Sequence, residues 1–193
     1  AIEDGCTIIL DALRGLVLIN PDQAVVSRYE DIRTRYAAFQ QAIAQNAGLR
    51  AESPDGLRVA VRGNIEMPRE AERVLKNGGE GVGLYRTEFG FITRPTIPSE
   101  QELYEEYSEL LSRMAPHKVT FRTLDVGADK MHWSQKSLQE ANPALGLRAI
   151  RFCLRNQYMF RRQLRAILRA SVHGNAALMF PLISGVKEMR QAK

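Results

Sequence analysis

The spacing of apolar residues changes near residue 57 and divides the chain into two parts. The first part begins with two short apolar runs, at 6–11 and 16–20, separated by the turn-like segment 12–15. Two such runs joined by a short turn predict a β-hairpin, or the last two strands of a preceding unit.

A long helix is predicted from Asp22, as a possible N-cap, to about Gly48. Its apolar residues recur at alternating steps of four and three, the heptad spacing of a helix with one narrow apolar face. These residues are Val25, Tyr29, Ile32, Tyr36, Phe39 and Ile43. This pattern favours a connecting helix that docks on a neighbouring domain or helix, with a free coiled coil as the alternative.

From residue 57 onward, after a loop at 48–56, strand-like and helix-like segments alternate. Strands are predicted at 57–64, 81–85, 119–123 and 178–183, and helices at 68–76, 99–114, 145–171 with a break near Asn156, and from 185 onward. This alternation predicts right-handed βαβ units and a parallel sheet. An open doubly wound sheet and a (β/α)8 barrel both have this order.

Two of the predicted strands end in Arg-Thr with an acid close behind: Arg86 precedes Glu88, and Arg122 precedes Asp125. Neighbouring strands would bring the two arginines together. Two guanidinium groups held close repel each other unless an anion lies between them, and the planar fork of arginine suits phosphate or carboxylate. The alternative is a purely structural role, with each arginine paired to the acid that follows it.

The ends of the strands also favour one of the two possible folds. Asn64 closes the strand predicted before the two arginine strands, so three polar side chains occupy successive carboxyl ends. A (β/α)8 barrel keeps its functional residues at that end of its strands. We therefore predict an α/β fold, the first half of a (β/α)8 TIM barrel, preceded by the hairpin and the long linker helix.

Three motifs that follow one another in the chain resemble the phosphoenolpyruvate-utilising enzymes. They occupy residues 79–89, 122–130 and 142–151. Within this family the stretch 163–171 is most similar to Enzyme I of the bacterial sugar phosphotransferase system and to its nitrogen-related paralogue. Enzymes of the pyruvate phosphate dikinase and phosphoenolpyruvate synthase type are the alternative within the family.

The resemblance implies a phosphoenolpyruvate (PEP)-binding (β/α)8 barrel that uses Mg²⁺. It implies transfer of the phosphoryl group to a histidine on a swivelling domain, and then to a small histidine-phosphorylated carrier protein. By similarity, Arg86, Arg122 and Arg148 belong to the cluster that binds PEP. Asp125, Asp129 and Lys130 would fix the arginine rotamers by ion pairing. The sequence departs from the family at Ala128, where a second glycine is usual, and at 131–133.

The resemblance also implies the domain organisation. Residues 1–21 would end an upstream phosphohistidine domain, residues 22–56 would be the linker helix and loop, and residues 57–193 would be the N-terminal half of the barrel. The phosphorylated histidine, the Mg²⁺ ligands and the acid that protonates the enolate are then expected outside this chain. We expect no catalytic residue or metal ligand within it, and no turnover by it alone.

The positive charge of the chain suggests an alternative function, nucleic-acid binding. The net charge is +5, and 21 of the 27 basic residues are arginine. Seven of them fall on predicted helices within 22 positions: Arg148, Arg151, Arg155, Arg161, Arg162, Arg165 and Arg169. Such a stripe could follow a nucleic-acid backbone, but no aromatic stacking platform accompanies it. We favour ion pairs with acids of neighbouring elements or at a dimer interface. A non-catalytic scaffold that has kept the fold is a further alternative.

Other features of the sequence bear on where the protein is located in the cell. No apolar run reaches the roughly 18 residues that predict a membrane span, and no signal-peptide pattern is present. Cys6 and Cys153 are far apart and fit no metal or redox spacing, so we expect reduced packing residues. We expect a cytoplasmic protein, a homodimer, without nucleic-acid partners or membrane insertion.

Overall fold

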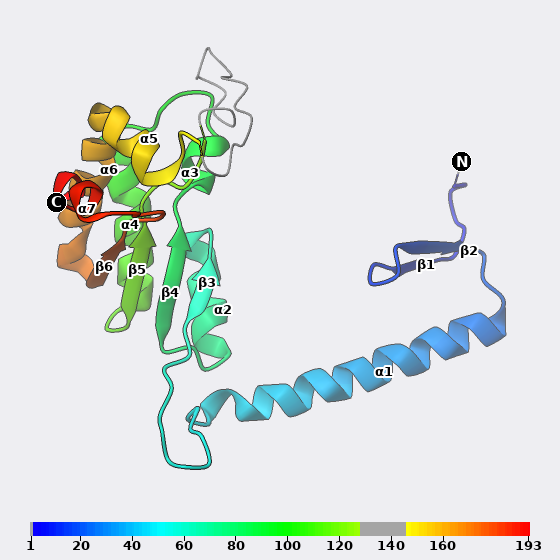
Figure 1. Cartoon of the computed structure of the whole chain (residues 1–193). Helices are drawn as coiled ribbons and strands as arrows, with labels where there is room; N and C mark the ends of the chain where they lie inside the picture. The colour runs from blue at the N-terminus through cyan, green and yellow to red at the C-terminus, as the bar shows by residue number, and fades with distance from the viewer. Residues whose placement is uncertain (1, 128–145) are drawn as a thin grey trace. The chain divides into compact units, whose positions relative to one another are not determined.

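The computed structural model describes residues 2–127 and 146–193. The chain forms two compact units, residues 1–47 and residues 48–193, each with its own architecture (Figure 1). The long helix belongs to the first of these units. The predicted linker of 22–56 stays a prediction. The assignment of residues 1–21 to a phosphohistidine domain stays a prediction.

The first unit contains the predicted hairpin and helix. Strand β1 (Ile8–Asp11) pairs antiparallel with β2 (Leu16–Ile19), and α1 spans Gln23–Gln45 before a 3-10 turn, η1 (Asn46–Gly48). Asp22 caps α1, because its side chain accepts a hydrogen bond from the Val25 N–H at 2.8 Å. The hydroxyl of Tyr29 donates to Asp11 Oδ2 at 3.1 Å and ties the helix to the hairpin.

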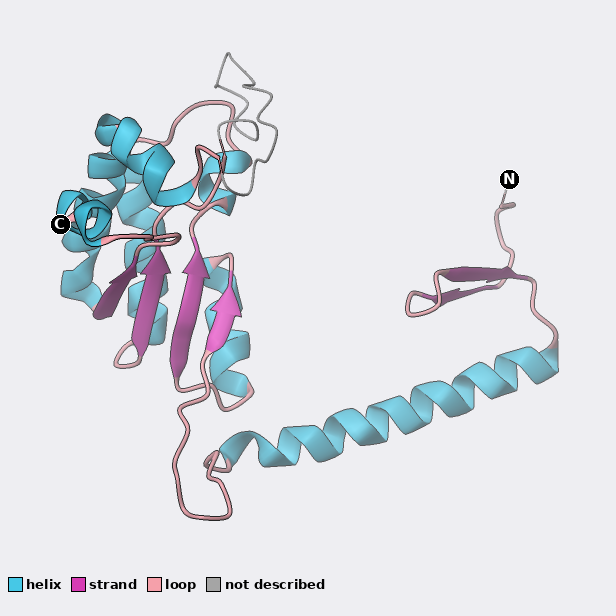
Figure 2. Ribbon diagram, in the orientation of Figure 1, coloured by secondary structure: helices cyan, strands magenta, loops and turns pink. Residues whose placement is uncertain are grey.

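The second unit is built on a four-stranded parallel sheet (Figure 2). Its strands are β3 (Gly63–Ile65), β4 (Gly81–Arg86), β5 (Lys118–Arg122) and β6 (Asn175–Met179), and they lie in chain order. Consecutive parallel strands in chain order are the arrangement of a (β/α)8 barrel. The described residues form an open sheet, as the predicted first half of a barrel would.

Helices connect the strands of this sheet. They are η2 (Pro68–Glu70), α2 (Ala71–Lys76), α3 (Phe89–Ile92), α4 (Glu100–Met114), α5 (Ala149–Arg155), α6 (Gln157–Ala170), η4 (Ser171–His173) and α7 (Val186–Ala192). The predicted capping box opens α4: Ser99 accepts from the Glu102 N–H, and Glu102 accepts from the Ser99 N–H. The predicted break at Asn156 separates α5 from α6.

The core lies between the sheet and the helices on one of its faces (Figure 2). At its centre three fully buried rings meet at centroid distances of 5.1 to 6.2 Å: Tyr85 of β4, Phe121 of β5 and Tyr107 of α4. Because side chains alternate along a strand, Arg86 and Arg122 point to the other face. In a barrel that face is the interior.

Two predicted strand positions are wrong. Residues 57–62 are not a strand, although Leu57, Val59 and Val61 alternate with polar residues, and all three are exposed. The fourth strand is Asn175–Met179 and not 178–183. Its register is fixed by pairing with β5, and Pro181, which lacks the N–H that a ladder needs, lies in the predicted run.

No helix among the described residues is both long enough and apolar enough to span a bilayer.

Candidate functional site

The carboxyl ends of β4 and β5 bring two predicted residues together. Arg86 and Arg122 are the last residues of their strands and are direct partners in the parallel register. Adjacent strands lie about 4.8 Å apart. The predicted juxtaposition of the two arginines is therefore confirmed.

Arg86 is the more accessible of the pair. Its Nη1 atom lies 3.0 Å from Glu66 Oε1, and both side chains are 45% exposed. An ion pair this exposed contributes little stability. A guanidinium carries five N–H donors, and the contact with Glu66 uses one nitrogen. Arg86 can therefore bind a second anion without losing its first partner.

Arg122 is held more tightly. Its Nη2 atom contacts Glu88, and its Nη1 atom lies 3.1 Å from Asp125 Oδ2. Its Nε atom is buried without a hydrogen-bond partner among the described residues. The sequence also suggested a structural role, in which the arginine pairs with the acid that follows it. The ion pair with Asp125 gives Arg122 this structural role.

Arg148 joins the same cluster through Asp125. It is the N-cap residue of α5, and its backbone pairs with that of Gly127 in an isolated antiparallel bridge. Asp125 Oδ1 accepts from Arg148 Nη2 at 2.9 Å and from Nε at 3.3 Å. One carboxylate therefore orients two predicted site residues, as the sequence suggested for Asp125. Asp129, Lys130, Ala128 and 131–133 lie outside the described residues.

We call Arg86, Arg122, Arg148, Glu66, Glu88 and Asp125 the arginine rim. Its three guanidinium groups and three carboxylates balance formally, so an anion should bind at the N–H donors of Arg86 that Glu66 leaves free, or where a carboxylate is neutral. Glu88 is more easily neutralised by protonation than a glutamate in water. Burial raises its pKa, and its Oε2 atom is buried without a hydrogen-bond partner among the described residues.

Two residues were not singled out from the sequence: Glu66, which belongs to the rim, and Gln163, which supports it. Glu66, the partner of Arg86, follows the short strand β3. Gln163 lies on the buried face of α6 and is hydrogen-bonded to the segments that follow β4 and β5. A polar residue on a helix face that is otherwise apolar was the available signal for Gln163.

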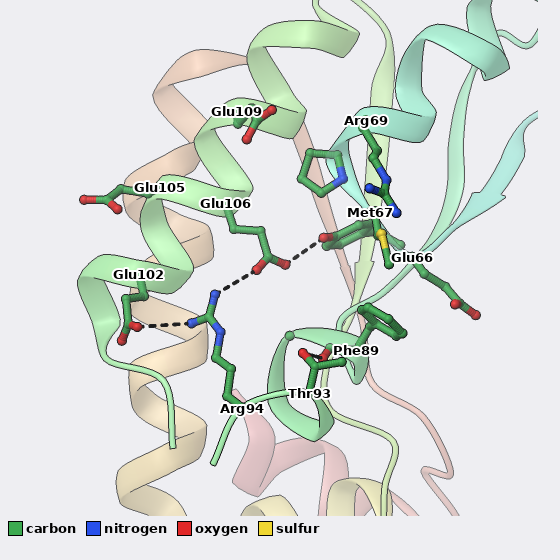
Figure 3. A pocket seen from close by; sticks show the side chains of 13 residues that line it. Glu66, Met67, Arg69, Phe89, Thr93, Arg94, Glu102, Glu105, Glu106 and Glu109 are labelled. Atoms are coloured by element: carbon green, nitrogen blue, oxygen red, sulfur yellow. Dashed lines mark hydrogen bonds and ion pairs between the residues drawn. The ribbon is translucent and has the colours of Figure 1, made fainter. Parts of the chain in front are cut away.

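A hollow of about 510 Å³ lies on the helix side of the sheet (Figure 3). Five glutamates and two arginines line it: Glu66, Glu102, Glu105, Glu106, Glu109, Arg69 and Arg94. Glu106 accepts from the Tyr85 hydroxyl at 2.7 Å and lies 3.5 Å from Arg94, and burial raises its pKa. The excess of carboxylates repels anions, so the arginine rim is the better anion site.

The residues of the rim do not suit a metal ion. Within residues 2–127 and 146–193 no group of three or more His, Cys, Asp or Glu side chains is arranged to hold one. Each rim carboxylate instead contacts a guanidinium.

The arginine stripe of α5 and α6 is partly engaged within the protein. Arg169 pairs with Glu100 at 2.8 Å and lies over the ring of Tyr104, and Arg162 lies over the ring of Tyr158. These contacts support the ion-pairing interpretation over a nucleic-acid interface.

Comparison with known proteins defines the class. The family model described as "PEP-utilising enzyme, PEP-binding domain" matches residues 40–193, and the chain belongs to this family. This confirms the resemblance seen in the three motifs.

Three of the most similar relatives all belong to one kind of enzyme within this family. The phosphoenolpyruvate-protein phosphotransferase of Priestia megaterium is 45% identical over 192 residues, which is 100% of this chain and 34% of the relative. Those of Listeria innocua and Bacillus subtilis are each 44% identical, over 96% and 100% of this chain and 32% and 34% of the relatives. The chain spans about a third of the length of these proteins.

Proposed function

We propose that the protein transfers the phosphoryl group of PEP to a histidine of the same enzyme and then to a small carrier protein. This chain would supply part of the PEP site. The juxtaposition of Arg86 and Arg122 in the β4–β5 register carries the proposal, with Arg148 linked to them through Asp125. The shared name of the relatives supports phosphoryl transfer from PEP to a protein.

The rim fits the chemistry of this substrate. PEP carries a phosphate and a carboxylate, and guanidinium forks bind both types of anion. Phosphoryl transfer requires little covalent chemistry from the protein, since catalysis comes mainly from positioning and from positive charge around the phosphoryl oxygens. Arg86 would offer its exposed N–H donors, while Asp125 holds Arg122 and Arg148 in fixed orientations.

Further details belong to the same proposal. We propose a Mg²⁺ cofactor whose ligands lie outside the described residues, a homodimeric assembly and a cytoplasmic location. Sugar transport is the proposed context, with the context of the nitrogen-related paralogue as the alternative, because the stretch 163–171 is similar to both enzymes. The phosphotransferase relatives favour this activity over the dikinase or synthase type.

A phosphoryl-transfer assay on the full-length protein tests the proposal. Pyruvate release with PEP and the carrier protein should be measured for the wild type and for Arg86→Ala, Arg122→Ala and Arg148→Ala. Losing one charge-assisted hydrogen bond to phosphate costs roughly 1.5 to 3 kcal/mol, so kcat/KM for PEP should fall about ten- to a hundredfold in each.

Arg113→Ala is the matched control. Arg113 pairs with Glu72 and Glu109 on the outer helices and contacts none of the rim residues in the contacts described. Its kcat/KM should match the wild type. A wild-type protein that neither binds PEP nor releases pyruvate would support the scaffold alternative and refute the proposal.

A further inference from the structure

Gln163 is a polar residue in the middle of the core. Its side chain on α6 is 1% exposed, and Phe160, Ala166 and Ile167 on the same helix are buried beside it. Burying an amide costs free energy unless each of its polar groups finds a partner.

Its amide joins two strand ends. Oε1 accepts a hydrogen bond from the Leu124 N–H at 3.1 Å, and Nε2 donates to Thr87 Oγ1 at 2.9 Å. Nε2 also lies 3.4 Å from the Tyr107 hydroxyl. Thr87 directly follows Arg86 at the end of β4, and Leu124 follows β5 by two residues. One side chain thus contacts both segments that leave the rim.

The connection continues to the rim itself. The hydroxyl of Thr87 donates to the backbone oxygen of Arg122 at 2.8 Å. Leu124 is held from its other side as well, because the Cys153 thiol lies 3.7 Å from the Leu124 carbonyl oxygen. Burial raises the pKa of that thiol to about 12, which fits a structural group and not a nucleophile. Leu124 directly precedes Asp125, the carboxylate shared by Arg122 and Arg148.

These contacts need an amide. A methionine of similar volume can fill the space, but it leaves the Leu124 N–H without a partner and gives Thr87 Oγ1 no donor. Packing alone would therefore be satisfied by an apolar side chain, whereas the paired acceptor and donor fix one relative position of the two segments.

We propose that Gln163 is a positioning residue that sets the separation of Arg86 and Arg122 at the rim. The inference rests on the proposed function, namely that PEP binds there. Phosphate recognition by several guanidinium groups needs their placement to within about 0.5 Å. Loss of the amide therefore weakens PEP binding even though Gln163 itself lies behind the strands.

The test uses Gln163→Met in the full-length protein, with steady-state kinetics and thermal unfolding. KM for PEP should rise about tenfold, because the arginines lose their fixed separation. KM for the carrier protein should stay at the wild-type value. Ile167→Val is the control, since Ile167 is buried one turn along the same helix and its truncation costs about 0.5 to 1.5 kcal/mol. It should lower the unfolding temperature without changing KM for PEP.

Thr87→Val removes the other end of the same contact with almost no change in volume, so it tests the idea even if Gln163→Met fails to fold. It should reproduce the rise in KM for PEP. The combined effect of the two changes should be smaller than the sum of the single effects, because both remove the Gln163–Thr87 hydrogen bond, while each also removes one contact of its own.

The outcomes separate the two proposals. A wild-type KM for PEP in both Gln163→Met and Thr87→Val, with Arg86→Ala impaired, would overturn the positioning role and leave the proposed function intact. An absence of PEP binding by the wild type would overturn both.

Discussion

Arg122 serves the fold and the proposed site at once. Its contacts with Glu88 and Asp125 tie the end of β5 to the segments around it, and its side chain is 19% exposed. Breaking a partly buried pair by removing one member is costly, because the other charge then lacks a partner. Substitution of Arg122 should therefore affect stability as well as PEP binding, whereas substitution of the exposed Arg86 should affect mainly binding.

The raised pKa of Glu88 leads to a pH-dependent prediction. Above that pKa the carboxylate is charged and opposes an anion at Arg122; below it the carboxyl is neutral and the opposition is lost. Glu88→Gln removes the charge at every pH. Titration calorimetry at pH 8 should show PEP binding at least about fivefold more tightly to the variant, since one opposing charge costs roughly 1 kcal/mol at 4 Å in water and more at a partly buried site.

This advantage should shrink as the pH falls through the raised pKa, because the wild-type carboxyl then becomes neutral too. Comparing proteins at the same pH cancels the protonation of the phosphate itself. Glu105→Gln removes an exposed charge from the helix side of the sheet and should leave affinity unchanged. Weaker binding by Glu88→Gln at every pH would mean that Glu88 chiefly orients Arg122.

The sequence predicted the positions of some residues of the rim, but not those of Glu66 and of Gln163 behind it. Arg86, Arg122 and Asp125 follow predicted strands, so their place at one edge followed from the strand pattern. Arg148 came only from the family resemblance. Glu66 and Gln163 could not be paired with their partners, because those contacts depend on how β3 and α6 pack and not on local sequence.

At the scale of elements, the approach of β4 to β5 depends on Gly81. Its φ is +145°, and a Cβ atom there would lie 2.5 Å from the Lys118 carbonyl oxygen. Gly81→Ala should destabilise the sheet by roughly 2 to 4 kcal/mol, from this overlap and from backbone strain. Denaturant unfolding measures the loss, and KM for PEP should rise because the strands carry Arg86 and Arg122.

Gly48→Ala is the control for this substitution. No atom lies within 4 Å of the corresponding Cβ position, and the backbone of Gly48 is not in the left-handed region. Its free energy of unfolding should stay within about 0.5 kcal/mol of the wild type. Equal stability of the two variants would show that β4 and β5 tolerate a wider separation.

Element types were easier to predict than element limits. The N-caps at Asp22 and Ser99 fixed two helix starts, since capping depends on local hydrogen bonds. The limits of β3 and β6 depend on pairing with β4 and β5, which a single segment does not encode. The one-turn helix α3 is too short to show a helical period.

At the scale of the whole molecule, the two units present different surfaces. In the first unit Ile32, Tyr36, Phe39 and Ile43 of α1 are exposed. The predicted docking of this apolar face therefore remains a prediction. In the second unit strand order and parallel sense meet the requirements of a half-barrel, and the match of residues 40–193 to the PEP-binding domain agrees with that fold.

The central claim is that β4 and β5 bring Arg86 and Arg122 to one phosphate group. A double-mutant cycle tests it most directly, with PEP affinity measured by titration calorimetry on the full-length protein carrying Arg86→Ala, Arg122→Ala or both. Each single change should cost roughly 1.5 to 3 kcal/mol. Their combined cost should differ from the sum by at least about 0.5 kcal/mol, as expected for residues that share a ligand.

Arg86→Ala combined with Arg113→Ala should show no such coupling, because Arg113 contacts outer-helix acids. Wild-type affinity in both rim variants, or strict additivity of two large losses, would contradict the claim that the two arginines hold one phosphate.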